Sequence, residues 1–408
     1  MLVNRKMRTV VHVITKFAHQ AWAGAENSIV EISKRLPAYG FKSEVYSILA
    51  FSDQRRETIA GIGVRRFRGF YTQPGRLRPM SHAEGQLSVG AVSPALLWSL
   101  ATNKDVAIVH LHCHERLTTS AAHVCWRRKL PYLYTIHSFY DPSRHAPLLG
   151  LPGLSYEWGV RRANRVITVG PRELRTLKSV YPERARNVLC IPNGVDAEVF
   201  GAGDAARFRR EYEIPREAAL LVHVGRIYGL KNQLYSVRLL AETLRRGADV
   251  VLALVGPVFD DAYFRALNSE IDRQELRPRV RLVGGLEPGD WRLASAYRAA
   301  DLVLLPSEDE AQGLVLLEAW AAGAGVLASN IENLRKFIVP GVTGELLPQD
   351  WSLPEAAETV KAMIANRVQY REGTRKAAEK YNWDATAKQI AGCYEDMLEQ
   401  AGARTPCM

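Results

Sequence analysis

The chain has 408 residues, of which 47% are hydrophobic and 24% charged, the composition of an ordinary globular protein of about two domains. Its longest apolar runs, such as Val250–Phe259, are shorter than the roughly 20 residues of a membrane span, and the N-terminus lacks the features of a signal peptide. Five scattered cysteines without CxxC spacing argue against a disulfide framework and a zinc site, so we expect a cytoplasmic protein.

The net charge of +11 is concentrated in the first half of the chain. Residues 1–200 contain 28 Lys and Arg against 14 Asp and Glu, whereas residues 201–408 contain 26 against 29. The basic half predicts an anionic partner, for which phosphorylated substrates, anionic lipid headgroups and nucleic acid are candidates. A compositional bias that serves solubility alone is the alternative.

Short apolar strands alternate with helical patterns along the first half. Between about residues 50 and 90 we expect a basic loop, in which Arg65–Tyr71 interleaves cations with aromatic rings, a composition that suits a surface resting on anionic headgroups. The predicted helix is Ala25–Leu36, and the predicted strands are Thr9–Thr15, Lys42–Leu49, Val106–Leu111, Tyr132–Ile136, Arg165–Val169 and Asn187–Ile191.

The second half repeats this alternation. Strands rich in Val, Ile and Leu that alternate with helices indicate parallel, doubly wound sheets. Two such blocks, joined near Pro192–Pro215, predict an α/β protein with two Rossmann-like domains facing a central cleft, where ligands bind outside the carboxyl ends of the strands. The predicted strands are Ala219–Val224, Asp249–Val255, Val280–Val283, Asp301–Leu305 and Gly325–Ser329, and the helices are Asn232–Arg245, Tyr263–Arg273 and Trp291–Ala299.

A loop of small residues, Trp22–Glu26, follows the first predicted strand and opens the first helix. Gly24 lets a ligand approach the backbone, and a helix N-terminus favours an anion. A tight structural turn explains the loop equally well, so the motif is weak by itself.

Arg226 and Lys231 stand five positions apart, just after the first strand of the second half. The guanidinium offers a fork and the ammonium a point charge, so both can converge on a diphosphate. The surrounding glycines and the place at a strand end favour this interpretation over two solvated surface cations. Neither a Walker loop nor a GxGxxG fingerprint is present in the sequence.

Glu318 lies in an apolar helical run, Leu314–Trp320, where burial of an unpartnered carboxylate would cost several kcal/mol, roughly. We expect it to bind two vicinal hydroxyls, as a ribose presents. Glu310 precedes this helix in a loop, and the helix is predicted to begin at Gln312-Gly313 with its N–H groups directed at a ligand. The alternative for Glu318 is a structural salt bridge to an arginine.

These motifs together carry a family resemblance. The segments Pro192–Asp196, Gly225-Arg226-x4-Lys231 and Glu310-x7-Glu318, in this order, resemble the family 4 retaining glycosyltransferases of GT-B fold, over nearly the whole chain. The resemblance implies an acceptor-binding domain over residues 1–200, a nucleotide-sugar domain over residues 201–380, and a final segment, 381–408, that crosses back to the first domain as a helix starting near Trp383.

The resemblance also assigns roles to single residues. Arg226 and Lys231 would bind the donor diphosphate, Glu310 the hexose, and Glu318 the ribose. His137, which follows a buried strand, would contact the donor sugar and the acceptor. The implied catalytic residues are His137, Arg226, Lys231 and Glu310, and the implied donor-binding residues are Gly24, Arg226, Lys231, Leu286, Glu310, Gly313, Leu314 and Glu318.

Two departures from the family pattern bear on specificity. Gln312 stands where the family has an aromatic residue, which would alter the preference for the donor sugar. Ala23 replaces the first of two glycines beside Gly24, which would narrow the phosphate loop. Neither departure removes a charged contact.

The histidines of the segment His110-Leu-His112-Cys-His114 share one face if the strand continues through them, and histidine is a common zinc ligand. We expect the strand to end near residue 111, which leaves His112 or His114 to line the cleft and provides no metal site. The sequence also lacks an Asp-x-Asp motif. Arg226 and Lys231 would therefore offset the diphosphate charge without a divalent cation.

The predicted function is metal-independent, retaining transfer of a sugar from a nucleotide-diphosphate sugar, a co-substrate rather than a cofactor, to an acceptor hydroxyl. The acceptor would be a glycan, a glycolipid or a small molecule of cell-surface glycan biosynthesis. A cytoplasmic enzyme that docks on the inner membrane face fits the basic first half. The alternatives are a nucleotide-sugar epimerase of the same fold and a non-catalytic basic binding protein, although no nucleic-acid module is recognisable.

Overall fold

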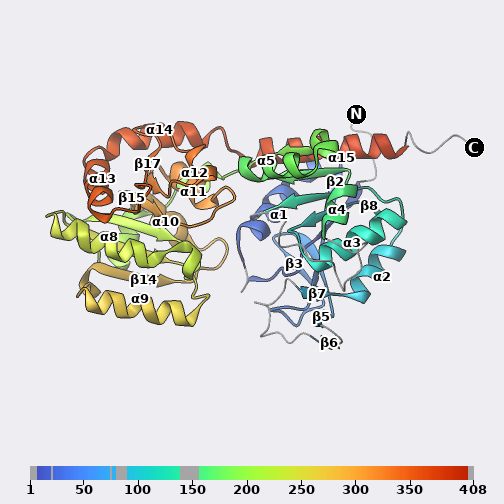
Figure 1. The fold of residues 1–408 in the computed structure, drawn as a ribbon, viewed down its shortest axis with the longest axis horizontal. Helices are drawn as coiled ribbons and strands as arrows, with labels where there is room; N and C mark the ends of the chain where they lie inside the picture. Colours follow the sequence, from blue (N-terminus) through green and yellow to red (C-terminus); the bar gives the residue numbers. More distant parts are fainter. Residues whose placement is uncertain (1–6, 20–21, 74–75, 80–89, 138–155, 403–408) are drawn as a thin grey trace, which may run out of the picture. The chain divides into compact units, whose positions relative to one another are not determined.

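The computed structural model describes residues 7–19, 22–73, 76–79, 90–137 and 156–402. The chain forms two compact units, which are drawn in Figure 1. The N-terminal unit comprises Met1–Asn193 with Trp383–Met408, and the C-terminal unit comprises Gly194–Asn382. The boundaries between the units lie after Asn193 and after Asn382. The sequence predicted these boundaries after residues 200 and 380. The expected linker region carries two helices of the C-terminal unit, α6 (Ala197–Gly201) and α7 (Ala205–Glu211).

A sheet of eight described strands, in the order β11-β10-β9-β8-β1-β2-β4-β3, lies at the centre of the N-terminal unit. Neighbouring strands are parallel except for β3 and β4. A smaller antiparallel sheet has the order β6-β5-β7. The strands are β1 (Arg8–Val13), β2 (Phe41–Ile48), β3 (Arg56–Ile59), β4 (Ile62–Phe67), β5 (Phe70–Gln73), β6 (Arg76–Pro79), β7 (Ala91–Val92), β8 (Val106–His112), β9 (Tyr132–Ile136), β10 (Arg165–Thr168) and β11 (Val188–Cys190).

The segment predicted as a basic loop is instead largely strand, from β3 to β6. Arg66 on β4 is buried, with an ion pair to Glu57, and its Nη2 donates to the Phe17 carbonyl oxygen at 2.6 Å. Arg65 lies over the Tyr46 ring, 5.1 Å from its centroid, and donates to the Tyr46 hydroxyl at 2.8 Å. The prediction of a loop here is therefore wrong, and because the fold itself uses these two cations, the predicted contact of this segment with a membrane would have to use other side chains.

Helices complete the N-terminal unit. The final helix α15 packs beside α1, and its Tyr394 is fully buried with its ring edge toward Phe41, at 5.3 Å between centroids. None of the described helices has the combined length and apolar character that crossing a membrane requires. The helices are α1 (Gly24–Arg35), α2 (Pro94–Thr102), α3 (Arg116–Arg127), α4 (Tyr156–Arg162), α5 (Pro171–Val180) and α15 (Trp383–Gly402).

The C-terminal unit is built on a sheet of six described strands, all parallel, in the order β14-β13-β12-β15-β16-β17. Its strands are β12 (Ala219–Val224), β13 (Val250–Val255), β14 (Val280–Gly284), β15 (Leu302–Leu305), β16 (Gly325–Ala328) and β17 (Gly344–Leu346). Besides α6 and α7, its helices are α8 (Gln233–Arg245), α9 (Asp261–Arg273), α10 (Trp291–Ala299), α11 (Leu314–Ala322), α12 (Glu332–Arg335), α13 (Leu353–Ala365) and α14 (Arg367–Ala378).

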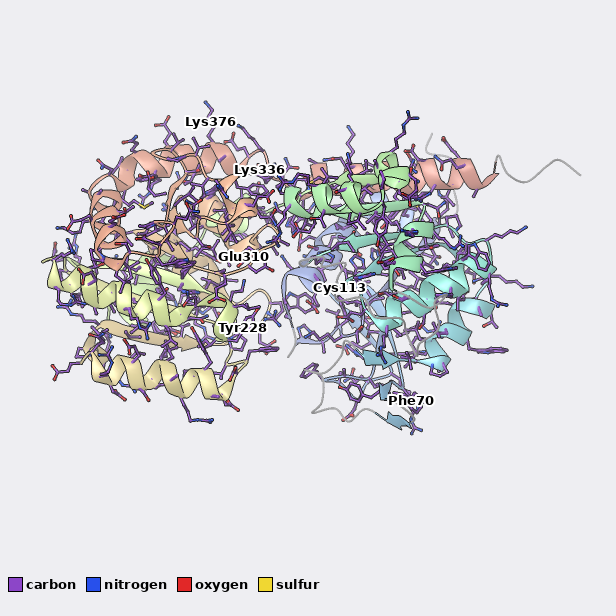
Figure 2. The ribbon with its side chains drawn as sticks, viewed as in Figure 1. Phe70, Cys113, Tyr228, Glu310, Lys336 and Lys376 are labelled. Carbon is purple, nitrogen blue, oxygen red and sulfur yellow. The ribbon has the colours of Figure 1, made fainter. Side chains whose placement is uncertain are left out.

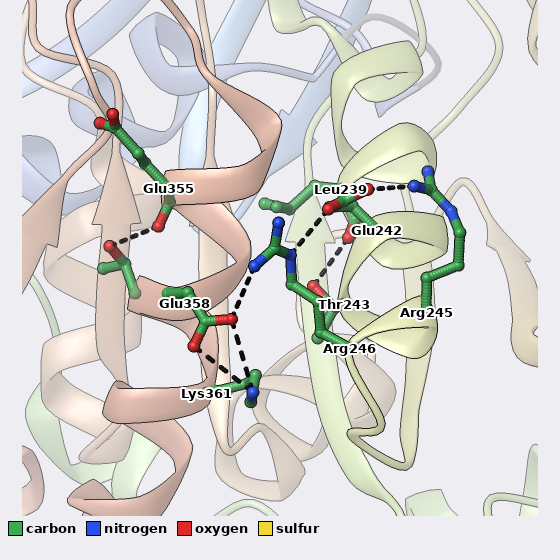
Figure 3. A network of polar contacts seen from close by, with 9 residues as sticks. Leu239, Glu242, Thr243, Arg245, Arg246, Glu355, Glu358 and Lys361 are labelled. Carbon is green, nitrogen blue, oxygen red and sulfur yellow. Dashed lines mark hydrogen bonds and ion pairs between the residues drawn. The ribbon is translucent and has the colours of Figure 1, made fainter.

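Helices α8 and α13 pack against each other in the C-terminal unit. An ion pair between Arg246 and Glu358, at 2.9 Å, joins the two helices (Figure 3). Arg246 also contacts Glu242 of α8 at 2.7 Å, and Lys361 contacts Glu358 within α13 at 3.4 Å. Partly exposed pairs of this kind contribute little stability each. Apolar burial, for example of Leu240, holds α8 on the sheet and so fixes the loop between β12 and α8.

Candidate functional site

The loop after β12 carries the two predicted diphosphate-binding cations. Gly225 begins it, and a Cβ added there would lie 3.6 Å from the Lys231 side chain. A Cβ on Gly256, at the end of the neighbouring β13, would lie 2.1 Å from the Gly225 carbonyl oxygen. The contact at Gly225 is ordinary van der Waals contact, whereas glycine at position 256 is required for these two strand ends to approach so closely. Lys231 ends a short 3₁₀ turn, and Asn232 follows it in the left-handed conformation, with φ of 58°.

The Arg226 guanidinium lies against two aromatic rings. Its central carbon is 4.8 Å from the Phe259 ring centroid and 5.6 Å from that of Tyr228, which Figure 2 labels. The Gln233 side-chain amide donates to the Arg226 carbonyl oxygen at 2.9 Å, which ties the loop to the start of α8. Contact with aromatic rings does not consume the five N–H donors of an arginine, so this side chain can still bind an anion.

Lys231 and Glu310 form an ion pair, with side chains 17% and 10% exposed. The Ser307 hydroxyl donates to the same Glu310 oxygen at 2.9 Å, and the Asn333 amide donates to the Glu310 carbonyl oxygen at 2.9 Å. The loop after β15 is thereby joined to the loop after β12. The sequence assigned Lys231 and Glu310 to different parts of one ligand, and the structure brings the two side chains into direct contact.

Gly313 marks the start of α11. It has a φ of 77° and occupies the N-cap position, so the helix begins at Leu314 rather than at the predicted Gln312. A side chain at Gly313 would be strained by this conformation and would meet Leu305 at 3.5 Å. The Leu316 N–H donates to the Gly313 carbonyl oxygen at 2.9 Å, and the two N–H groups that precede it at the helix N-terminus can bind an oxygen-rich ligand. Gln312, in place of the family's aromatic residue, is buried.

Glu318 lies on α11, half-buried, and its carboxylate accepts a hydrogen bond from the Tyr297 hydroxyl at 2.7 Å. Tyr297 belongs to α10 and is fully buried. Burial raises the pKa of Glu318 to about 7, and the tyrosine hydrogen bond offsets only part of that effect. The hydrogen-bond partner is a neutral hydroxyl and not the arginine of the alternative interpretation.

Three buried histidines lie together in the N-terminal unit. β8 extends to His112, one residue beyond the predicted end, so His110 and His112 share a face with His12 of the adjacent β1. Their ligand atoms lie within 4.8 Å of one another, the spacing of a possible metal site. The predicted third member, His114, lies outside the strand with its ring edge toward Tyr134.

Every ring nitrogen of these three histidines has a hydrogen-bond partner. His12 Nδ1 contacts His112 Nε2 at 2.9 Å, and the remaining contacts are His12 Nε2 to Ser43, His110 to Tyr394 and Thr135, and His112 Nδ1 to His137. Burial lowers the pKa of His12 to about 3 and those of His110 and His112 well below their usual value. A metal ion would have to displace these bonds and bring charge into a fully buried place, so the cluster fits a neutral hydrogen-bonded network better.

The remaining predicted residues lie in different parts of the fold. Gly24 is the first residue of α1, in the N-terminal unit, and its carbonyl oxygen accepts from the Ser28 hydroxyl at 2.9 Å. His137 directly follows β9 in the same unit. Leu286 follows β14 in the C-terminal unit, where it packs against the apolar core.

Two family descriptions match the chain, one over most of each unit. Glycosyltransferase Family 4 matches residues 22–199, and Glycosyl transferases group 1 matches residues 204–381. The chain belongs to the family 4 glycosyltransferases. It is a glycosyltransferase that uses a nucleotide sugar.

Curated relatives of this glycosyltransferase align with most of its chain. D-inositol 3-phosphate glycosyltransferases from Geodermatophilus obscurus and Kribbella flavida are 27% and 28% identical over 400 residues, 92% of this chain and 85% and 91% of theirs. Anabaena HepE, solved with UDP and glucose, has a TM-score of 0.74 at 20% identity, covering 95% of this chain and 100% of its own. Sucrose-phosphate synthase from Thermosynechococcus elongatus has a TM-score of 0.73 at 19% identity, covering 96% and 100%. These structures confirm the GT-B fold with two Rossmann-like domains.

Sequence reasoning missed the groups that hold the charged residues of this glycosyltransferase in place. Tyr297, Ser307 and Asn333 contact Glu318 or Glu310. Ser307 lies three residues before Glu310 at the end of an apolar strand, which is a usable signal. Tyr297 is separated from Glu318 by 21 residues on another helix, and no local pattern marks it.

Proposed function

We propose that this glycosyltransferase retains the anomeric configuration, needs no divalent cation, and transfers a sugar to a hydroxyl of a phosphorylated acceptor. The observation that carries the donor side is the contact of Lys231, Glu310 and Ser307 where the loops after β12 and β15 meet. Such a group offers a cation to a diphosphate and a carboxylate to sugar hydroxyls. Glu318 then binds the ribose through the carboxylate oxygen that Tyr297 leaves unoccupied.

The proposed reaction breaks the bond between the anomeric carbon and the diphosphate oxygen and forms one to the acceptor oxygen. The acceptor proton passes to the departing diphosphate, so atoms and charge balance. Arg226 and Lys231 stabilise the negative charge of the leaving group, the task that a divalent cation performs elsewhere. Glu310 is paired with Lys231 and Ser307, which suits a positioning role better than that of a nucleophile and supports front-face transfer with retention.

The proposed acceptor carries a phosphate. Relatives over the full length are named D-inositol 3-phosphate glycosyltransferases, and residues 1–200 hold 28 cationic against 14 anionic side chains. A free phosphorylated polyol carries such a phosphate, and so does the headgroup of a glycolipid used in cell-surface glycan synthesis at the inner membrane face. Because Arg65 and Arg66 are engaged within the fold, a membrane contact would have to use other cations.

A panel of nucleotide sugars, assayed by thermal shift and then by product analysis, tests the proposal. A ligand at 100 times its dissociation constant stabilises the folded state by about 2.7 kcal/mol, so the donor should stand out. With EDTA present throughout, a product that retains the anomeric configuration of the donor sugar should form only when a phosphorylated acceptor is added. An epimer formed from the donor alone would identify an epimerase instead, and the absence of any nucleotide-sugar binding would leave a non-catalytic protein.

A further inference from the structure

Hydrogen bonds connect His137 to the interior of the N-terminal unit. His112 Nδ1 lies 3.0 Å from His137 Nε2, His112 Nε2 lies 2.9 Å from His12 Nδ1, and His12 Nε2 lies 3.2 Å from Ser43 Oγ. We name Ser43, His12, His112 and His137, in this order, the histidine chain. It crosses the sheet from β2 through β1 and β8 to the residue that follows β9, a strand order fixed by the parallel pairing.

The inner rings of the histidine chain are sealed from solvent. His12 and His112 have no exposed area, and their rings stack at 5.2 Å between centroids. His137, at the end of the chain, is only partly buried, and its ring lies 5.3 Å from that of His112. Since buried polar groups must find partners within the protein, each inner ring depends on its two neighbours in the chain.

The hydrogen bonds of the histidine chain restrict which tautomers its three rings can adopt together. A neutral imidazole carries one N–H and one bare nitrogen, and each link between two rings uses one of each. If His12 donates from Nδ1, then His112 must donate from Nδ1 to His137, which keeps its own proton on Nδ1. In the opposite sense all three carry the proton on Nε2, and the Ser43 hydroxyl can either donate or accept.

We propose that His112 is a positioning residue that holds His137 in one ring orientation and one tautomer, with His12 and Ser43 anchoring its far side. A partner on one ring nitrogen commonly decides which proton a working histidine presents at the other. The role of His137 in sugar transfer is the one that the family resemblance implies and rests on the proposed function, whereas the contact with His112 does not. His110 stands outside the histidine chain, because its nitrogens bond to Tyr394 at 2.7 Å and Thr135 at 2.6 Å.

Two substitutions at one position separate positioning from simple packing. The amide of Asn lies near the place of Nδ1, so His112→Asn preserves the contact with His137 and gives up that with His12. The amide of Gln lies near the place of Nε2, so His112→Gln does the reverse. ¹⁵N spectra of labelled histidines should show one shared tautomer for His12, His112 and His137 in the unsubstituted protein. In His112→Asn the amide still bonds to His137 by donating or accepting, so His137 should show a single tautomer, whereas His112→Gln should give a mixture of tautomers at His137.

Tyr394→Phe is the matched control, because it removes a hydroxyl from the neighbouring buried His110 and leaves the histidine chain intact. It should leave the His137 spectrum unchanged. Different tautomers among the three rings of the unsubstituted protein, or equal His137 spectra in the Asn and Gln variants, would overturn the proposal. The unsubstituted spectrum gives this answer even where a variant fails to fold.

Turnover then separates the inference from the proposed function. His112→Gln should lower kcat about tenfold with little change in the KM for the donor, whereas His112→Asn should stay near the unsubstituted value. If the His137 tautomer changes as expected but kcat does not, positioning by His112 stands and the catalytic role proposed for His137 falls.

Discussion

The buried charged and polar groups of the two units are satisfied in different ways. In the N-terminal unit, the ring nitrogens of His12, His110 and His112 all have partners within the protein, and the rings stay neutral. In the C-terminal unit, Glu318 keeps a carboxylate half-buried with one hydroxyl as its partner, and its pKa is raised to about 7.

This difference distinguishes groups that stabilise the fold from groups that are available to bind a ligand. A network closed by its own hydrogen bonds gains little from a bound molecule, since every donor and acceptor is already used. A carboxylate held out of water with one neutral partner is unstable until hydroxyls approach it. We therefore expect substitutions in the C-terminal unit to change ligand binding more than stability.

The largest effect is expected at the cations of the loop after β12. Arg226→Ala or Lys231→Ala should lower kcat at least about a hundredfold, because each offsets negative charge on the departing diphosphate. Steady-state kinetics with the donor found by the panel measures the effect. Lys336→Ala, an exposed cation of the same unit, is the control and should be neutral. Near-normal turnover in both loop variants, with the fold intact, would remove the donor site from this loop.

Glu318→Gln should stabilise the ligand-free protein at alkaline pH. The folded-state pKa of Glu318 is raised, so the folded state binds more protons than the unfolded one between pH 4.5 and 7, and stability falls as the pH rises through this window. The loss amounts to about 3 kcal/mol at most, and the glutamine variant avoids it. Urea unfolding at pH 5 and pH 8 compares the two proteins. A variant that is less stable at pH 8 would point to a structural carboxylate.

A smaller effect is expected for the pair of Lys231 and Glu310. Lys231→Ala leaves the Glu310 carboxylate with Ser307 alone, which should cost about 1–3 kcal/mol of unfolding free energy. Adding Glu310→Gln should recover part of this loss, and the double-mutant cycle gives the coupling. Additive losses would mean that the two side chains do not interact in solution.

Removal of divalent cations should have no effect. Because Arg226 and Lys231 are proposed to carry the charge of the diphosphate, activity should survive an excess of EDTA. Complete loss, with recovery on adding manganese or magnesium, would contradict metal-independent transfer and would require a metal site beside the donor diphosphate.

The sequence predicts the fold well because apolar strands and amphipathic helices leave periodic patterns. It also places the charged site residues at strand ends, which needs only the strand order of a parallel sheet. The sequence could not predict the hydrogen-bond partners of the buried side chains. His12 and His112, for example, are 100 residues apart, and no local pattern pairs them. The region around Arg66 was predicted as a loop because an inward-facing arginine breaks the alternation of apolar and polar residues expected of a strand. The partners that compensate its buried charge, Glu57 and the Phe17 carbonyl oxygen, are apparent only in the folded structure.

Donor affinity as a function of pH tests most directly the claim that Glu318 awaits the ribose. Calorimetric titration with the preferred nucleotide sugar should show weaker binding at pH 6 than at pH 8, because protonation of a carboxyl with a pKa of about 7 removes an acceptor. Glu318→Gln should bind the donor about 1–3 kcal/mol more weakly at pH 8 and show no such pH dependence. Equal affinity and equal pH dependence in both proteins would contradict the assignment.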